Sequence, residues 1–391
     1  MIAVILAGGK GSRLAPVTNF LPKALVPING SPILKRHFDQ LKRIGISKVI
    51  VLTGYLASSI KDFCKTYSGE LEITCIETNP DWTPADRILA SESIIGTEFF
   101  LIYCDNYVTS DEDLQSVLKS ASELTFLIES RDIGNIKLDS NQRAYYLAGT
   151  RKQSHKYVEL GNIYIRTEKF YEELRNTRDL PKTLQLFSEK YPCSYKIATN
   201  PIISLSSFEN YKKIVADRRI ILLDRDGILL EKMPTREYLT KFSDYAPIYD
   251  NWSVLREISQ IGIDFIIATN QPGIATGQVS EVFLQQLHTK LISELTNYGI
   301  NVLSIFVCKH HWDVGCNCRK PKAGMLIEAM EKFSIASTDT LYVGDEEKDS
   351  AAAVNAGIDY VLVSREVEDK FAFTDLALAK STILAKILKI D

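Results

Sequence analysis

The 391-residue sequence contains no apolar run that approaches the roughly 20 residues of a membrane-spanning helix. The apolar stretch at residues 1–7 is too short for a signal peptide and has no basic residues before it. Neither charge is in excess, because 46 basic and 49 acidic side chains leave a net charge of −3, which argues against nucleic-acid and anionic membrane partners. These absences predict a cytoplasmic protein whose partners are small molecules. They leave its oligomeric state open.

Cysteine is also scarce, with seven residues. Four of them lie apart in apolar or strand-like surroundings and are expected to be small buried side chains. Cys308, Cys316 and Cys318 lie close together, and in a reducing compartment such clustering indicates a metal site rather than a disulfide. His310 and His311 lie in the same stretch, and three thiols with one imidazole can complete a tetrahedral zinc site.

Length and composition predict more than one domain. A chain of this length corresponds to two or three domains of about 150 residues each. A hydrophobic content of 45% with 24% charged residues is typical of a soluble globular protein. Strand-like apolar runs alternate with helical spacing through both halves, which predicts α/β domains. We place the domains at residues 1–216 and 217–391, joined by a short linker.

A glycine-rich loop follows the first predicted strand, residues 2–7. Its glycines, Gly8, Gly9 and Gly11, let backbone amides approach a ligand closely. Together with Lys10 and Arg13, these amides form a cradle for an anion. A glycine-rich loop after a strand is also common as a plain connection, so the loop alone leaves both interpretations open.

Two stretches of the first half carry a resemblance to a known family. LAGGKGSRL at 6–14 and PKALVPI at 22–28 together resemble the hallmark of the sugar nucleotidyltransferases, and the resemblance covers about residues 1–214. It implies a Rossmann-like mixed sheet. It also implies a reaction in which a sugar 1-phosphate oxygen attacks the α-phosphorus of a nucleoside triphosphate and pyrophosphate leaves. By this resemblance Arg13 binds the triphosphate, Lys23 the reacting phosphates, Asp105 a Mg²⁺ ion, and Glu159 and Asn162 the sugar.

Three positions depart from that family. The segment at 79–91, where the family's base-binding segment is usually rich in glycine, contains none. Cys104 stands where a glycine commonly precedes the metal-binding aspartate, and Ser204 replaces the second metal-binding aspartate. One carboxylate fewer weakens the hold on a metal ion. The first half is therefore either a nucleotidyltransferase or a catalytically weak or inactive module that binds nucleotide sugars.

The second half places polar side chains at the ends of predicted strands. Asp224 and Asp226 follow the apolar run at 220–223. Residues i and i+2 of an extended chain point to the same side, so these two carboxylates can share one small volume. The carboxyl ends of parallel strands meet at one edge of a sheet, which predicts a site for phosphate and magnesium there. The other members of this set are Thr269 and Asn270, Asp345 and Asp349, and Lys320 from a loop.

These motifs are similar to those of the haloacid dehalogenase-like phosphatases, over residues 219–391. The resemblance implies a parallel sheet with a minimal cap. It makes Asp224 the nucleophile that forms an aspartyl-phosphate, and Asp226 the acid that protonates the leaving oxygen and then activates water. Thr269 and Lys320 would hold the phosphoryl oxygens. Asp345, Asp224 and the backbone carbonyl of Asp226 would bind Mg²⁺.

The cysteine cluster narrows the resemblance to a zinc-containing subgroup. The form Cys-x-His followed by Cys-x-Cys assigns His310, rather than His311, to a structural zinc ion with Cys308, Cys316 and Cys318. The ion would fix the loop that presents Arg319 and Lys320. This zinc loop occurs in heptose bisphosphate phosphatases and in histidinol phosphatases, so the resemblance allows both substrates.

The pairing of the two halves favours the heptose substrate. A heptose 1,7-bisphosphate 7-phosphatase releases a heptose 1-phosphate, which is the kind of molecule that a sugar nucleotidyltransferase consumes. The chain therefore resembles a fusion of these two enzymes. Transferases of this kind are typically guanylyltransferases, which makes GDP-heptose the expected product. Ile228 and Glu346 depart from the phosphatase pattern, since a threonine and a lysine commonly stand there.

Overall fold

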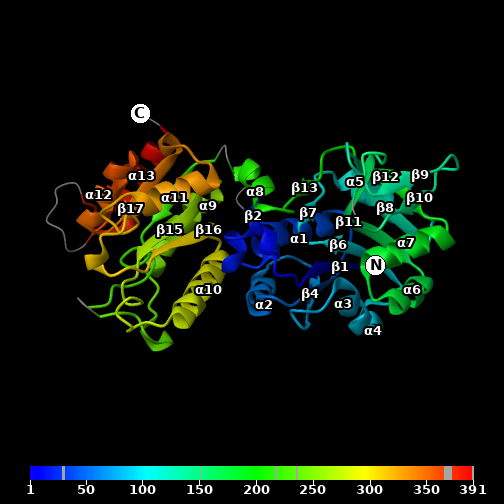
Figure 1. The fold of residues 1–391 in the computed structure, drawn as a ribbon, viewed down its shortest axis with the longest axis horizontal. Coiled ribbons are helices and arrows are strands. Elements are labelled where there is room, and N and C mark those ends of the chain that lie inside the picture. The colour runs from blue at the N-terminus through cyan, green and yellow to red at the C-terminus, as the bar shows by residue number, and fades with distance from the viewer. Residues whose placement is uncertain (29–30, 150, 216–217, 235–236, 365–371, 390–391) are drawn as a thin grey trace. The chain divides into compact units, whose positions relative to one another are not determined.

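The computed structural model describes residues 1–28, 31–149, 151–215, 218–234, 237–364 and 372–389. These residues form two compact units (Figure 1). The first comprises Met1–Thr18, Pro22–Leu25 and Ile33–Ser207, and the second comprises Asn19–Leu21, Val26–Pro32 and Phe208–Asp391. The predicted domain boundary, between residues 216 and 217, lies outside the described residues.

A nine-stranded sheet forms the centre of the first unit. Its main path runs β10-β9-β11-β6-β1-β4-β5, and β8 pairs with both β11 and β12. The strands β6, β1, β4 and β5 are parallel, whereas β11 is antiparallel to β6 and β8, so the predicted mixed sheet is confirmed. The strands are β1 (Ile2–Ala7), β4 (Lys48–Thr53), β5 (Glu72–Glu77), β6 (Glu98–Tyr103), β8 (Leu124–Ser130), β9 (Ile136–Leu138), β10 (Ala144–Tyr146), β11 (Tyr157–Arg166) and β12 (Ser194–Ile197).

The helices of the first unit bury apolar faces against this sheet. Ile33, Leu34, Phe38 and Leu41 of α1 recur at helical spacing and are all buried, as an amphipathic helix requires. A small antiparallel pair, β7 (Asn106–Tyr107) with β13 (Ile203–Ser204), lies next to the end of β6. The helices are α1 (Ile33–Arg43), α2 (Ala57–Thr66), α3 (Pro84–Ala90), α4 (Glu92–Ile95), α5 (Asp111–Leu118), α6 (Lys169–Thr177) and α7 (Leu180–Lys190).

The second unit contains a five-stranded parallel sheet in the order β16-β15-β14-β17-β18. Its central strand, β14 (Ile220–Leu223), is buried along its whole length, as expected for a parallel strand covered on both faces. The other strands are β15 (Asp264–Asn270), β16 (Val302–Cys308), β17 (Thr340–Gly344) and β18 (Asp359–Leu362). The predicted parallel sheet is therefore confirmed.

Helices flank the sheet of the second unit (Figure 1). Helix α9 packs against α10 and α13, and α11 packs against α12. The unit also contains the short pair β2 (Pro27–Ile28) and β3 (Ser31–Pro32). The helices are α8 (Phe208–Val215), α9 (Tyr249–Gln260), α10 (Glu281–Tyr298), α11 (Gly324–Phe333), α12 (Glu347–Ala356) and α13 (Leu376–Leu388). None of the helices in the described part of the chain is long and apolar enough to cross a membrane.

Helix α12 is longer than its apolar pattern indicates. The alanine-rich stretch predicts a helix over 351–356, whereas the helix begins at Glu347. A capping box starts the helix earlier. The side chain of Glu346 accepts the backbone N–H of Asp349, and the side chain of Asp349 accepts the backbone N–H of Glu346. The Asp349 carboxylate, through Oδ2, also accepts the backbone N–H of Asp345 at 3.2 Å. The cap therefore holds the segment that follows β17 in place.

Candidate functional sites

Three strands of the second unit deliver polar residues to one edge of the sheet. Asp224 follows β14, Thr269 is near the end of β15, and Asp345 follows β17. All three side chains are buried, at 1–5% exposure. Oxygen atoms of Asp224, Asp345 and Asp349 lie within 4.8 Å of one another. The structure thus brings Asp224, Asp345 and Asp349 together. Asp226 is linked to Thr269 of the same site through Gln271.

Lys320 lies at the centre of this cluster and is fully buried. Its Nζ is 2.8 Å from Asp224 Oδ2 and 2.8 Å from Asp349 Oδ1. It also donates to the backbone carbonyl of Ala268 at 3.0 Å and to the Tyr342 hydroxyl at 2.8 Å. Although burial opposes the charge, these neighbours raise the pKa of Lys320 well above its ordinary value. Lys320 is therefore a fixed cation beside the predicted nucleophile.

The carboxylates also fit a divalent cation. Burial raises the pKa of Asp224 to about 7 despite the attraction of Lys320, which shows how poorly the protein alone compensates the charge. Asp345 Oδ1 is buried and has no hydrogen-bond partner among the described residues. A Cβ at Gly227 would lie 2.1 Å from Asp345 Oδ2, so only glycine fits there. Clustered hard oxygen atoms of this kind suit Mg²⁺.

Asp226 differs from Asp224 in its surroundings. Its side chain is 31% exposed, and it has no contact with Lys320 among the contacts described. Arg225 Nε and Nη2 donate to its two carboxylate oxygens at 3.0 and 2.9 Å. Gln271 Nε2 donates to Asp226 Oδ2 at 3.0 Å and to the hydroxyl of Thr269 at 2.8 Å. Asp226 is thus oriented by the protein yet open to a substrate and to water.

Asn270 and Arg319, which were predicted to bind the substrate, both lie next to Lys320. Asn270 exchanges two hydrogen bonds with the backbone of Lys320, at 3.1 and 3.2 Å, so both ends of its amide hold that loop. Arg319 Nη1 is buried without a hydrogen-bond partner among the described residues. A guanidinium nitrogen in this condition is a ready donor for an anion.

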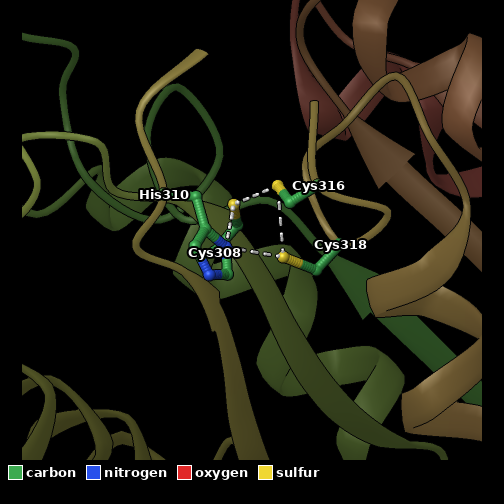
Figure 2. A group of neighbouring side chains, drawn as sticks. All are labelled: Cys308, His310, Cys316 and Cys318. Atoms are coloured by element: carbon green, nitrogen blue, oxygen red, sulfur yellow. Dashed lines mark hydrogen bonds between the residues drawn. The ribbon is translucent and has the colours of Figure 1, made fainter. Parts of the chain in front are cut away.

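Four side chains of the loop that precedes Lys320 converge (Figure 2). Cys308 Sγ is 3.7 Å from Cys316 Sγ, and Cys316 Sγ is 3.5 Å from Cys318 Sγ. His310 Nδ1 is 3.8 Å from Cys308 Sγ and 3.2 Å from Cys318 Sγ. A tetrahedral ion with Zn–S bonds of about 2.3 Å separates two sulfurs by about 3.7 Å, so the geometry fits zinc. None of these cysteines forms a disulfide. His311 instead stacks on Trp312, at 3.8 Å between ring centroids.

The glycine-rich loop of the first unit borders a cavity of about 470 Å³. Gly8, Gly9 and Gly11 line it together with Arg13. Gly11 has a φ of +63°, in the left-handed region that favours glycine. The cavity is also lined by Trp82, Lys23 and Asp105.

Lys23 and Asp105 lie against each other, with 2.5 Å between Lys23 Nζ and Asp105 Oδ2. Both side chains are mostly buried, at 14% and 20% exposure. An ammonium group and a carboxylate that bind each other at the rim of a cavity can separate when a phosphate and a cation replace them. The two residues predicted to handle the reacting phosphates and the metal are thus neighbours.

A second cavity, of about 1190 Å³, shares Arg13 and Asp105 with the first. Glu159 lines it and is buried at 4% exposure, and this burial raises its pKa to about 7 although backbone amides of Gly161 and Asn162 oppose the shift. Asn162 is buried, and its Nδ2 has no hydrogen-bond partner within the described ranges. Ser204 also lines this cavity, because β13 pairs it with Asn106 beside Asp105. Ser204, which stands where the family has its second metal-binding aspartate, therefore lies in the wall of this cavity.

Sequence reasoning missed several residues of these sites. Lys232 Nζ lies 2.5 Å from Asp345 Oδ2 and 2.7 Å from Glu346 Oε1, and Tyr342 bonds Lys320 from inside β17. Arg87 is buried below the glycine-rich loop. No motif marks these three, because their contacts join segments far apart in the sequence. The sequence contains one signal for Lys232. Position 346 is a glutamate where a lysine is common, so the positive charge expected there is missing from the motif.

Known protein families match both ends of the chain. Residues 2–138 match the family described as nucleotidyl transferase, and residues 317–388 match the family described as HAD-hydrolase-like. A D-glycero-beta-D-manno-heptose-1,7-bisphosphate 7-phosphatase of Pseudomonas putida is 34% identical, over 37% of this chain and 82% of the relative. One of the same description from Pseudomonas aeruginosa is 32% identical, over 43% of this chain and 98% of the relative.

Among solved structures, HddC from Yersinia pseudotuberculosis is similar to 55% of this chain. The match covers 97% of that protein at 22% identity, with a TM-score of 0.45. The chain thus joins a nucleotidyltransferase domain at its N-terminus to a haloacid dehalogenase-like domain at its C-terminus.

Proposed function

The chain belongs to the family of heptose-1,7-bisphosphate 7-phosphatases, and from this premise we propose that it carries out two successive steps of heptose activation. The second unit removes the 7-phosphate of D-glycero-D-manno-heptose 1,7-bisphosphate. The first unit then transfers a nucleotidyl group, GMP from GTP, to the resulting heptose 1-phosphate and releases pyrophosphate. The observation that carries the proposal is the buried cluster of Asp224, Lys320 and Asp345 at one edge of the second sheet.

In the phosphatase, Asp224 attacks phosphorus and forms an aspartyl-phosphate, while the bond from phosphorus to the heptose oxygen breaks. Asp226 gives a proton to that oxygen, and afterwards takes a proton from the water that hydrolyses the aspartyl-phosphate. Lys320 and Thr269 hold the phosphoryl oxygens, and Arg319 adds a donor. Mg²⁺ bound by Asp224, Asp345 and the carbonyl of Asp226 would offset the repulsion between carboxylate and phosphate.

The phosphatase proposal is tested by phosphate release from purified protein with Mg²⁺. We expect heptose 1,7-bisphosphate to be hydrolysed faster than histidinol phosphate, measured as kcat/KM by phosphate detection. Nuclear magnetic resonance of the product should show that the anomeric phosphate is retained. A preference for histidinol phosphate would instead support the other substrate of the zinc-loop phosphatases.

In the transferase, no group of the protein needs to become covalently attached. Arg13 and the glycine-rich loop would bind the triphosphate, and Lys23 the reacting phosphates, so that the sugar phosphate oxygen attacks in line. Asp105 would hold Mg²⁺, and Glu159, which lines the second cavity, would bind the sugar together with Asn162. The match of residues 2–138 to the nucleotidyl transferase family supports this assignment.

Incubation with heptose 1-phosphate, Mg²⁺ and each of the four nucleoside triphosphates tests the transferase. We expect pyrophosphate release with GTP in excess of the other three, and about 100-fold less for Lys23→Met, since a positioned charge on reacting phosphates contributes several kcal/mol. Lys35→Met, on the exposed face of α1, is the matched control. An absence of pyrophosphate with all four nucleotides would favour a first unit that only binds nucleotide sugars.

Ser204→Asp is a gain-of-function prediction at the same site. Ser204 lies beside Asp105 in the second cavity, so a carboxylate there adds a second ligand for the metal. We expect the Mg²⁺ concentration for half-maximal transferase activity to fall several-fold, while phosphatase activity stays unchanged. Ser206→Asp, which lines the same cavity, is the comparison variant. An unchanged Mg²⁺ dependence would show that Ser204 is not at the metal position.

A further inference from the structure

Arg87 of α3 connects three segments that line or support the 470 Å³ cavity. Its side chain is 3% exposed. Nη2 donates to the backbone carbonyl of Gly8 at 3.1 Å, and to those of Pro80 and Trp82 at 3.0 Å each. Nη1 donates to the carbonyl of Thr53 at 3.1 Å and to the hydroxyl of Thr78. One guanidinium thus joins the glycine-rich loop, the end of β4 and the glycine-free segment at 79–83.

Two glycines make room for this side chain. A Cβ at Gly8 would lie 2.4 Å from Cζ of Arg87, and a Cβ at Gly54 would lie 2.5 Å from its Nη1. Neither contact is possible for a real side chain without displacement of the guanidinium. Gly8 is therefore required by Arg87 as well as by the close approach of a ligand to the loop.

The charge of Arg87 is not matched by an acidic partner. No carboxylate within the described residues forms an ion pair with it, and its acceptors are neutral carbonyl and hydroxyl oxygens. Burial lowers the pKa of Arg87, and only Asp86 nearby opposes this. A buried cation at the wall of a cavity that also contains Lys23 and Arg13 favours a highly charged anion as occupant.

We propose that Arg87 is the positioning residue of the nucleotide site: it locks the glycine-rich loop to the segment at 79–83, and so forms one cradle for triphosphate and base. The inference rests on the proposed nucleotidyl transfer. In this chain the guanidinium of Arg87 holds the backbone of the segment at 79–83, where the family usually has a glycine-rich segment. Lysine cannot replace it, because an ammonium group has three donors on one atom and cannot span carbonyls on separate segments.

The test compares Arg87→Lys and Arg87→Met with wild type in the full chain. We expect both variants to raise the KM for nucleoside triphosphate about 10- to 100-fold, because each variant removes several of the hydrogen bonds that the charged guanidinium donates. The KM for heptose 1-phosphate should change far less. Arg178→Met is the matched control, because Arg178 is exposed and its guanidinium pairs with Asp86 of α3, the helix that carries Arg87. Phosphatase activity of the same samples reports on the folded second unit, and a retained KM for heptose 1-phosphate reports that the first unit is folded.

Thr78→Val provides a milder variant if Arg87→Met does not fold. It removes one acceptor of Nη1 and keeps the guanidinium, so a several-fold increase in nucleotide KM is expected. Unchanged nucleotide KM in Arg87→Lys and Thr78→Val would overturn the inference while leaving nucleotidyl transfer intact. A wild-type chain that neither binds nor turns over any nucleoside triphosphate, measured by calorimetry and pyrophosphate release, would overturn the proposed transferase together with it.

Discussion

Asp224→Asn is expected to abolish phosphate release and to leave nucleotidyl transfer unchanged. Asparagine has the same shape as aspartate, but its amide cannot attack phosphorus. Loss of a covalent nucleophile costs at least about 10⁴-fold in kcat. Lys320 keeps its contact with Asp349 at 2.8 Å, so the buried ammonium is not left without a carboxylate and the unit should fold.

Both activities must be measured on one preparation of the Asp224→Asn variant, by phosphate and by pyrophosphate release. Asp250→Asn is the matched control, because Asp250 is an exposed residue in the first turn of α9. Loss of both activities in Asp224→Asn would argue against two independent sites. Phosphatase activity within tenfold of wild type would rule out Asp224 as the nucleophile.

Loss of the zinc ion that we propose for the cysteine cluster is expected to have the second large effect. Cys318, Arg319 and Lys320 are consecutive, so the loop that a zinc ion would fix also carries the two side chains that we propose bind phosphate. Binding of structural zinc contributes about 10–16 kcal/mol in small zinc-binding peptides. Even a fraction of that value in this larger unit would lower the melting temperature of the second unit markedly and reduce phosphate release.

Cys318→Ser isolates this effect. We expect the variant to lose the one equivalent of zinc that mass spectrometry should detect in the wild type, together with most of its phosphatase activity, while transferase activity persists. Cys64→Ser, in the first unit, changes a half-buried thiol outside the cluster and should have neither effect. Wild-type protein purified without zinc, yet fully active as a phosphatase, would contradict a structural role for the metal.

Local patterns predicted the parts of this molecule that depend on neighbours in sequence. The apolar run at 220–223 became the fully buried strand β14, because a parallel strand covered on both faces accommodates consecutive apolar residues. The carboxyl-edge rule for parallel strands then predicted that Asp224 and Asp345 would meet. The cysteines of the cluster were predicted to converge because they lie close together in the sequence.

Contacts that neither a sequence motif nor the strand-end rule marks could not be predicted in this way. Arg87 lies 79 positions from Gly8 and looks like an ordinary helix residue in the sequence. Lys232 supplies a charge beside Glu346 from a loop that no motif marks. Asp226 follows Asp224 closely, yet it is held by Arg225 and Gln271 rather than by Lys320, because the chain turns at Gly227. Such partners are chosen by packing, and the spacing along the chain does not encode them.

The arrangement around Arg87 has a consequence for how the chain can drift over generations. The guanidinium of Arg87 fills the space that a Cβ at Gly8 or Gly54 would need, so a larger residue at either glycine is not tolerated while Arg87 is present. The three residues should therefore be inherited as a set. Descendants that lose the arginine should still keep glycine at position 54, because a Cβ there would also lie 2.7 Å from the backbone carbonyl oxygen of Gly8.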